Sequence, residues 1–204
     1  MEIIVKPLSP ERLADYFDFF NNRAFTDNPP WGGCYCIAWQ MTKEEEKAQL
    51  YDKAEAYGGG QENFMRALRE IVVRQITSGA LRGYLAYVDG MSIGWCNAND
   101  KASFPIESAN GFHLYAPAEQ REKAVICFEI APAYRGKGVA TALLNQVVND
   151  AEAEGYAAVE GFPRVRDKRD EWDYSGPVRL YEKAGFRKVA EQQDGLVVMR
   201  KELK

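Results

Sequence analysis

Apolar positions along this chain change repeatedly between helical and extended spacing, which predicts helices packed against a sheet. The clearest helix follows residue 138, because apolar side chains recur there every three or four positions and form one stripe. The stripe consists of Val139, Ala140, Leu143, Leu144, Val147, Val148 and Ala151. Just before it, the apolar run 124–130 predicts a buried strand. A strand therefore leads through a short turn directly into a helix.

The same patterns predict the other elements. Strands are expected at 2–7, 81–88, 91–97, 157–162, 187–191 and 196–201. Helices are expected at 10–22, 42–57 and 61–77, with a short helix before Gly185. Asp89-Gly90 predicts the tight turn of a hairpin, and Thr42 with Glu45 predicts a capping box. Three consecutive glycines at 58–60 separate the two helices of the middle segment.

Length and composition predict one domain, or one domain with a large insertion, because 204 residues with 46% hydrophobic content can bury a sizeable core. No apolar run approaches the roughly 20 residues needed to cross a bilayer. Residues 1–5 lack a basic segment and read as a strand rather than a signal peptide, so we expect a cytoplasmic protein. The formal net charge of -4 argues against nucleic acid as a partner.

The cysteines give no metal or redox motif. Cys34 and Cys36 are spaced as Cys-x-Cys, Cys96 and Cys127 lie in predicted strands, and His113 is the only histidine. We therefore expect no metal site. The strand-like segment 34–36 predicts small buried hydrophobic side chains instead.

The turn before the 139–151 helix has the properties of an anion site. Residues 134–138 read Tyr-Arg-Gly-Lys-Gly. A glycine turn that opens a helix points several N–H groups at one spot, with the positive end of the helix dipole behind them. A P-loop would need Ser or Thr after Lys137, where the chain has Gly138. A dinucleotide motif would need a small residue where the chain has Thr141.

Two motifs carry a family resemblance. Arg135, Gly138 and Ala140 form Arg-x-x-Gly-x-Ala, which resembles the coenzyme A pyrophosphate loop of the GNAT acetyltransferase superfamily. Residues 180–186, Leu-Tyr-Glu-Lys-Ala-Gly-Phe, resemble the family's Tyr-x-x-x-Gly-Phe element. Ser175 is the expected N-cap of this short helix. The alternative for the first motif is an ordinary glycine turn between a strand and a helix.

The resemblance implies an α+β fold, an α/β/α sandwich whose mixed, mostly antiparallel sheet is flanked by helices. The chain is then a single GNAT domain, 1–204, of a bacterial subgroup with an extended N-terminal helical insertion at about 23–80. We expect the insertion to form a lid or wall of the substrate site. A solvated helical hairpin or a dimer contact is the alternative, and both monomer and homodimer stay open.

The resemblance also implies the chemistry, which is transfer of an acetyl group from acetyl-CoA to an amine by direct attack in a ternary complex. Main-chain groups of Phe128 and Ile130 would bind the pantetheine arm. Tyr181 matches the family position of the general acid. The pyrophosphate would be held by the loop residues Arg135, Gly136, Lys137, Gly138, Val139 and Ala140.

Two carboxylates are candidates for the general base. Glu129 lies inside an apolar strand, where a charge is costly unless it faces a polar cleft. Glu122 begins the same strand and resembles the base position of some relatives. Because seven residues separate them, an extended strand would point them to opposite faces. We favour Glu129, and a chain of waters without either residue is an open alternative.

Acceptor-binding candidates come from the insertion and the hairpin, and they are Trp31, Tyr35, Trp95, Asn97 and Asn99. The alternative is that the aromatic residues are core and the asparagines are turn formers. The hairpin residues 94–98 also look like a hairpin of a bacterial GNAT subgroup. The chain departs from many relatives at 172–175, where Trp-Asp-Tyr-Ser replaces an asparagine.

We therefore expect an N-acetyltransferase that acts on a small-molecule amine, without nucleic acid, membrane or metal. A protein or peptide N-acetyltransferase is the first alternative. A non-catalytic coenzyme A-binding regulator is the second, and transfer of a longer acyl group is the third.

Overall fold

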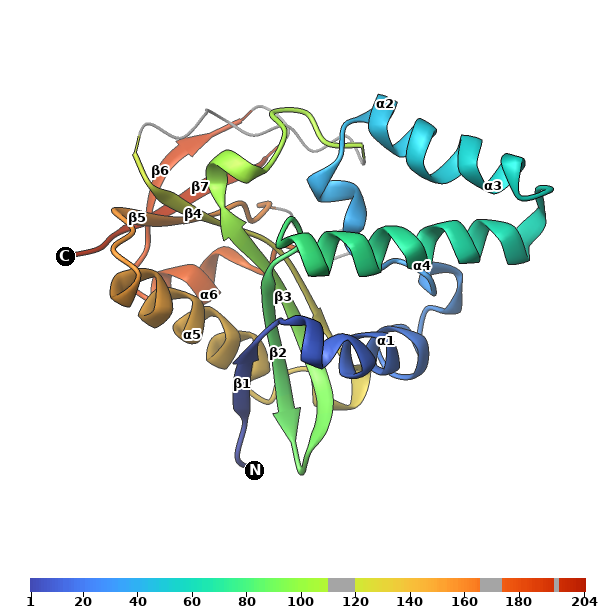
Figure 1. Ribbon diagram of the computed structural model, residues 1–204. Helices are drawn as coiled ribbons and strands as arrows, with labels where there is room; N and C mark the ends of the chain where they lie inside the picture. Colours follow the sequence, from blue (N-terminus) through green and yellow to red (C-terminus); the bar gives the residue numbers. More distant parts are fainter. Residues whose placement is uncertain (110–119, 166–173, 193–194) are drawn as a thin grey trace.

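The described part of the chain forms a seven-stranded sheet in the order β1-β2-β3-β4-β5-β7-β6 (Figure 1). The computed structural model describes residues 1–109, 120–165, 174–192 and 195–204. The strands are β1 Ile4–Pro7, β2 Gly83–Val88, β3 Met91–Asp100, β4 Glu122–Ile130, β5 Ala158–Gly161, β6 Arg187–Glu191 and β7 Val197–Glu202. Neighbouring strands are antiparallel except β4 and β5, which are parallel. The predicted α+β fold with a mixed, mostly antiparallel sheet is confirmed.

Helices cover both faces of this sheet (Figure 1). The helices are α1 Leu13–Asn22, α2 Lys43–Glu46, α3 Asp52–Ala56, α4 Gly60–Ser78, α5 Val139–Ala153 and α6 Val178–Lys183. Apolar residues of α5 and α6 share one buried cluster with one face of the sheet. Those of α1 and α4 share a second cluster with the other face. We call these the α5 face and the α4 face.

The sequence patterns explain the local structure well. In α5 the predicted stripe is buried, apart from the half-buried Ala140. Asp89 and Gly90 both have positive φ, 50° and 79°, as a type I′ hairpin turn requires. The capping box is present, because the Glu45 N–H donates to Thr42 Oγ1 and the Thr42 N–H donates to Glu45 Oε2.

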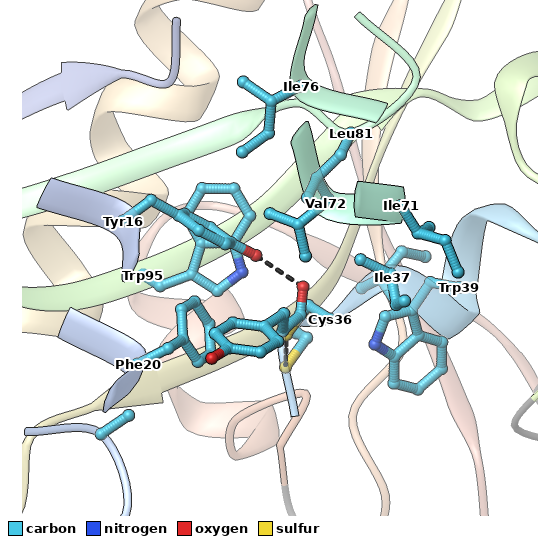
Figure 2. Close-up of a cluster of buried hydrophobic side chains, with 14 of the residues drawn as sticks. Tyr16, Phe20, Cys36, Ile37, Trp39, Ile71, Val72, Ile76, Leu81 and Trp95 are labelled. Carbon is cyan, nitrogen blue, oxygen red and sulfur yellow. Dashed lines mark hydrogen bonds between the residues drawn. The ribbon is translucent and has the colours of Figure 1, made fainter. Parts of the chain in front are cut away.

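The middle segment packs into the core of the α4 face. Helix α2, the π-helical turn η4 (Lys47–Tyr51) and α3 follow one another without interruption, and α4 begins after the glycine break. Leu50, Ala54 and Leu68 belong to the same buried cluster as Trp95 of β3. Figure 2 shows part of this core, where Ile71 and Val72 of α4 lie with Tyr16 and Phe20 of α1 and with Trp95. The insertion is thus partly internal rather than wholly solvated.

Two local predictions were wrong. Residues 34–36 are not a strand, since Cys36 has a left-handed backbone (φ 52°) and precedes the 3-10 helix Ile37–Gln40, and Cys34 is exposed. Ser175 does not cap α6, because Pro177 holds the N-cap position. The Ser175 hydroxyl instead donates to the carbonyl of Ile126. A long-range strand contact therefore replaces the expected local cap.

A β-bulge changes the prediction for the two carboxylates of β4. The register against β3 passes from Cys127 opposite Asn97 to Val125 opposite Ala98, so Ile126 is an extra residue. The bulge reverses the alternation of side chains, and Ala124 and Cys127 both join the core of the α4 face. Glu122 lies two residues before Ala124, and Glu129 lies two residues after Cys127. The two carboxylates therefore share one face of the sheet, whereas opposite faces were expected.

Two further class predictions concern metals and membranes. Within the described ranges, His, Cys, Asp and Glu side chains do not gather in a group of three or more that could bind a metal ion. In the same ranges, every helix is too short or too polar to span a bilayer. His113 lies outside the described residues.

Candidate cofactor and catalytic site

The turn between β4 and α5 forms an open cradle. Gly136 and Gly138 have left-handed backbones, with φ of 74° and 86°. A Cβ added to either glycine would meet no atom within 4 Å, so the space beside both is empty. The N–H groups of the first turn of α5 have no acceptor within the helix and carry the positive end of its dipole. The cradle therefore fits a phosphate group bound by main-chain donors.

The two basic side chains of this turn have different surroundings. Lys137 is exposed, and its Nζ lies 5.6 Å from the centre of the Tyr134 ring. The guanidinium of Arg135 folds back instead, because its Nε donates to the Ile130 carbonyl at 2.9 Å. Its Nη1 contacts Asp27 Oδ2 at 2.5 Å. Arg135 thus ties the loop to β4 and to the start of the insertion.

Strands β4 and β5 separate beside this loop. They pair only through residues 122–125 and 158–161, so residues 126–130 of β4 have no β5 partner. The Phe128 N–H donates to the carbonyl of Tyr174 at 2.6 Å. The structure therefore places a segment of the chain against Phe128, one of the two main-chain positions predicted to bind the pantetheine arm.

Tyr181 lies at the same gap. Its side chain is fully buried, and its hydroxyl donates to the Ser175 carbonyl at 2.8 Å. The ring packs edge-on against the rings of Phe128 and Phe186, with centroids at 6.5 and 5.3 Å. A Cβ on Gly161 would lie 2.0 Å from this ring, which explains the glycine in β5. Burial raises the pKa of Tyr181 well above its ordinary value, so the phenol is neutral and can donate a proton.

Glu129 lies at the end of β4 beside the cradle. Its side chain is 15% exposed, and its Oε1 is 3.3 Å from Arg135 Nη2. Burial raises the pKa of Glu129 to about 7, with Arg135 lowering it and Asp27 raising it. A carboxylate with this pKa can accept a proton near neutral pH, as a general base must.

Glu122 occupies a different environment. It forms a buried ring of four charges in which Lys101 Nζ lies 3.1 Å from Glu122 and 2.8 Å from Glu160. Arg200 Nη1 lies 2.7 Å from Glu122 and 2.8 Å from Glu160. Burial raises the pKa of Glu122, but the hydrogen bonds from Arg200 and Lys101 and the charges of these two cations together lower it by more. The net shift of the pKa is therefore downward.

This ring argues against Glu122 as the general base and favours Glu129. The carboxylate accepts from two cations in a closed network, and its lowered pKa makes it a weak base. Seven residues of strand, about 23 Å at roughly 3.3 Å per residue, separate it from Glu129. Glu122 therefore holds β4, β5 and β7 together instead of facing the cradle.

The predicted acceptor residues do not converge on one pocket. Trp95 is fully buried against Tyr16, with ring centroids 5.0 Å apart. Tyr35 is also buried, and its hydroxyl bonds Asn21. Trp31 is half-buried near Phe25. Trp95 and Tyr35 thus lie in the core of the α4 face and Trp31 packs against it, as the alternative interpretation of the aromatic residues expected.

The two asparagines are also internal. Asn97 is fully buried, and its amide donates to the Cys36 carbonyl and contacts the Gln40 amide. Asn99 is buried and donates to the Ala80 carbonyl. It lines a cavity of about 390 Å³ together with Lys123, at the end of β4 away from the cradle. Both side chains thus serve strand and loop packing.

Three residues beside this site were not among the predicted site residues. Asp27 lies 108 positions before its partner Arg135, inside a turn-rich segment without a motif. Tyr174 and Ser175 lie where relatives have other residues, so a family motif could not find them. Trp172 and Asp173 lie outside the described residues.

Comparisons with known proteins give a family match over the part of the chain that contains this site. The family model of the acetyltransferase (GNAT) domain matches residues 81–188, slightly more than half of the chain. The range includes β2 to α6, and with them the cradle and Tyr181. No curated protein matches the chain by sequence.

Solved structures share the fold at low sequence identity. An acetyltransferase of the GNAT family from Streptococcus pneumoniae has a TM-score of 0.55 at 16% identity, covering 100% of both chains. An N-acetyltransferase from Staphylococcus aureus Mu50 has a TM-score of 0.52 at 15% identity, also covering 100% of both. A Salmonella typhimurium structure described as an acetyltransferase with its cofactor acetyl-CoA has a TM-score of 0.52 at 14% identity, covering 99% of this chain and 94% of that one.

Proposed function

Because this chain belongs to the GNAT acetyltransferase family, we propose that it is an acetyl-CoA-dependent N-acetyltransferase for small-molecule primary amines. The acetyl group passes by direct attack of the amine in a ternary complex. The observation that carries the proposal is the open main-chain cradle at Gly136 and Gly138, with Tyr181 and Glu129 on either side of the strand that leads into it.

The cradle accounts for cofactor binding. Main-chain N–H groups of residues 136–140 would hold the pyrophosphate, and Lys137 would add a positive charge. The polar edge of β4 beyond Ile126 is where the pantetheine arm would lie, because β5 does not pair with it there. The thioester of acetyl-CoA supplies an activated acetyl group when the cofactor is bound.

Glu129 and Tyr181 would manage the two protons of the reaction. A lysine-type amine has a pKa of about 10.4 and must lose a proton before it attacks. Glu129, whose pKa burial raises to about 7, is the proposed acceptor of that proton. The neutral phenol of Tyr181 is the proposed donor to the departing thiolate.

The insertion supports a small acceptor. Helix α4 and the preceding segment pack on the face of the sheet that also carries Glu129, which favours an enclosed acceptor site over an open peptide groove. A peptide acceptor and a regulator without turnover are the alternatives, and the assays below separate them.

The first test is thermal unfolding with acetyl-CoA, coenzyme A and NADPH. A ligand at 100 times its Kd stabilises the native state by about 2.7 kcal/mol, which raises the midpoint clearly. We expect both coenzyme A species to raise it and NADPH to leave it unchanged. Gly138→Glu should abolish the effect, because it places a carboxylate in the cradle.

Gly155→Glu is the matched control. Gly155 also has a left-handed backbone and open space around it, but it lies at the opposite end of α5. The control variant carries the same charge and similar backbone strain, and it should keep the ligand effect. If neither coenzyme A species stabilises folded wild-type protein, the proposed function is wrong.

A further inference from the structure

Residues 174–176 fill the gap where β4 and β5 separate. The Tyr174 carbonyl accepts from the Phe128 N–H at 2.6 Å, and the Ser175 hydroxyl donates to the Ile126 carbonyl at 3.1 Å. Ser175 is only 5% exposed. The segment thus takes the place of a strand along the part of β4 that β5 leaves unpaired.

We propose that residues 174–176 are an internal plug that competes with acyl-coenzyme A for the edge of β4. The inference rests on the proposed function, because the competitor is the pantetheine arm. One N–H group makes one strong hydrogen bond at a time, so Phe128 cannot serve the Tyr174 carbonyl and the arm together. Binding of the arm at Phe128 therefore requires the plug to leave.

The plug also holds the proposed acid. The Tyr181 hydroxyl donates its proton to the Ser175 carbonyl at 2.8 Å, in a fully buried position. While this bond persists, the phenol cannot donate to another acceptor. Displacing Ser175 frees the hydroxyl at the moment when the arm takes its place. Cofactor binding and readiness of Tyr181 are thereby coupled.

The plug has a glycine at one end and an aromatic contact at the other. Gly176 has a left-handed backbone (φ 76°) and joins the plug to Pro177 at the start of α6, so it can act as a hinge. On the other side, the Tyr174 ring meets the Trp39 ring of the insertion at 5.0 Å. Displacement of Tyr174 therefore also changes the surroundings of Trp39 on the α4 face.

The coupling predicts that a weaker plug gives tighter coenzyme A binding. When only the open state binds, the apparent Kd equals the intrinsic Kd divided by the open fraction. Ser175→Ala removes the hydrogen bond to Ile126 and leaves the main chain intact. Loss of one net hydrogen bond raises the ratio of open to closed plug about fivefold. When the plug is mostly closed, the apparent Kd for coenzyme A should therefore fall about fivefold.

The test is calorimetric titration of coenzyme A into wild type, Ser175→Ala and Gly176→Ala. An alanine at 176 would be strained and would lie 3.0 Å from Leu180 Cδ2, so this second variant weakens the plug independently of the hydroxyl. Ser92→Ala is the matched control. Ser92 is 3% exposed and donates to the Asp15 carbonyl at the same 3.1 Å, but its partners lie in and beside α1.

The plug is supported if Ser175→Ala and Gly176→Ala bind coenzyme A more tightly than wild type, while Ser92→Ala binds equally. The plug is also supported if Ser175→Ala and Gly176→Ala bind coenzyme A while wild type and Ser92→Ala show no binding. If all four proteins bind and neither plug variant binds more tightly, the plug is wrong and the proposed function stands. If all four remain folded and none binds, the proposed function fails, and the plug fails with it.

Discussion

The ring of Lys101, Glu122, Glu160 and Arg200 gives a prediction that separates a structural role of Glu122 from a catalytic one. Glu122→Gln removes one of the two negative charges of the ring and leaves Glu160 as the only carboxylate inside it for Lys101 and Arg200. Breaking a buried pair by removing one partner costs about 3 to 5 kcal/mol. Glutamine keeps a hydrogen-bonding oxygen, so we expect about 3 kcal/mol of lost stability.

Glu202→Gln is the control for this experiment. Glu202 pairs with the same guanidinium, Arg200, at 2.6 Å, but its side chain is 70% exposed. Exposed pairs contribute about 0 to 1 kcal/mol, so the control should be nearly neutral. Urea unfolding of both variants and wild type, followed by circular dichroism at pH 7, measures the difference.

The pH dependence of the Glu122→Gln effect has a defined sign. Because the folded protein lowers the pKa of Glu122, its contribution is complete above the unfolded value, about 4.3, and is lost as pH falls through the folded value. The stability difference between wild type and Glu122→Gln should therefore begin to narrow as the pH falls below about 4.3, and it should close as the pH falls through the lowered pKa of the folded state. Equal stabilities of Glu122→Gln and Glu202→Gln at pH 7 would refute the structural role.

Three other outcomes follow from the site. Glu129→Gln should remove the acidic limb near pH 7 from the pH profile of kcat/KM. Asp27→Asn should move that limb to lower pH, because Asp27 raises the pKa of Glu129. If the limb is unchanged in both variants, Glu129 is not the base. Tyr181→Phe should lower kcat by about 10² to 10⁴ without weakening coenzyme A binding, and an unchanged kcat would exclude the phenol as the acid. Gly161→Ala should cost about 1 to 3 kcal/mol in urea unfolding, because its Cβ overlaps the Tyr181 ring, and a neutral result would contradict that packing.

Local patterns explain why much of the fold could be predicted. The stripe of α5, the Asp89-Gly90 turn and the Thr42 capping box each depend on residues within a few positions of one another. Backbone preference and hydrophobic spacing act over that range. The cradle belongs to the same class, since the turn, its glycines and the following helix are contiguous.

The chemistry around the cradle depends on contacts that the sequence could not predict. The bulge at Ile126 arises from pairing with β3 and reverses the faces of the two carboxylates. Arg135 would be expected to bind phosphate, yet Asp27, far away in sequence, holds its guanidinium elsewhere. The four charges of the ring that includes Glu122 come from four separate segments, so the strand alone could not distinguish a structural carboxylate from a base.

The most direct test of acetyl transfer is thiol release from acetyl-CoA with a panel of primary amines and peptides, using wild type and Gly138→Glu, with Gly155→Glu as control. We expect wild type and Gly155→Glu to release thiol only when a small amine is present, with Gly138→Glu inactive. Release with peptides alone would redirect the proposal to a macromolecular acceptor. If the protein binds coenzyme A but releases no thiol with any amine or peptide, the proposed acetyltransferase activity is contradicted and a coenzyme A-binding regulator is favoured.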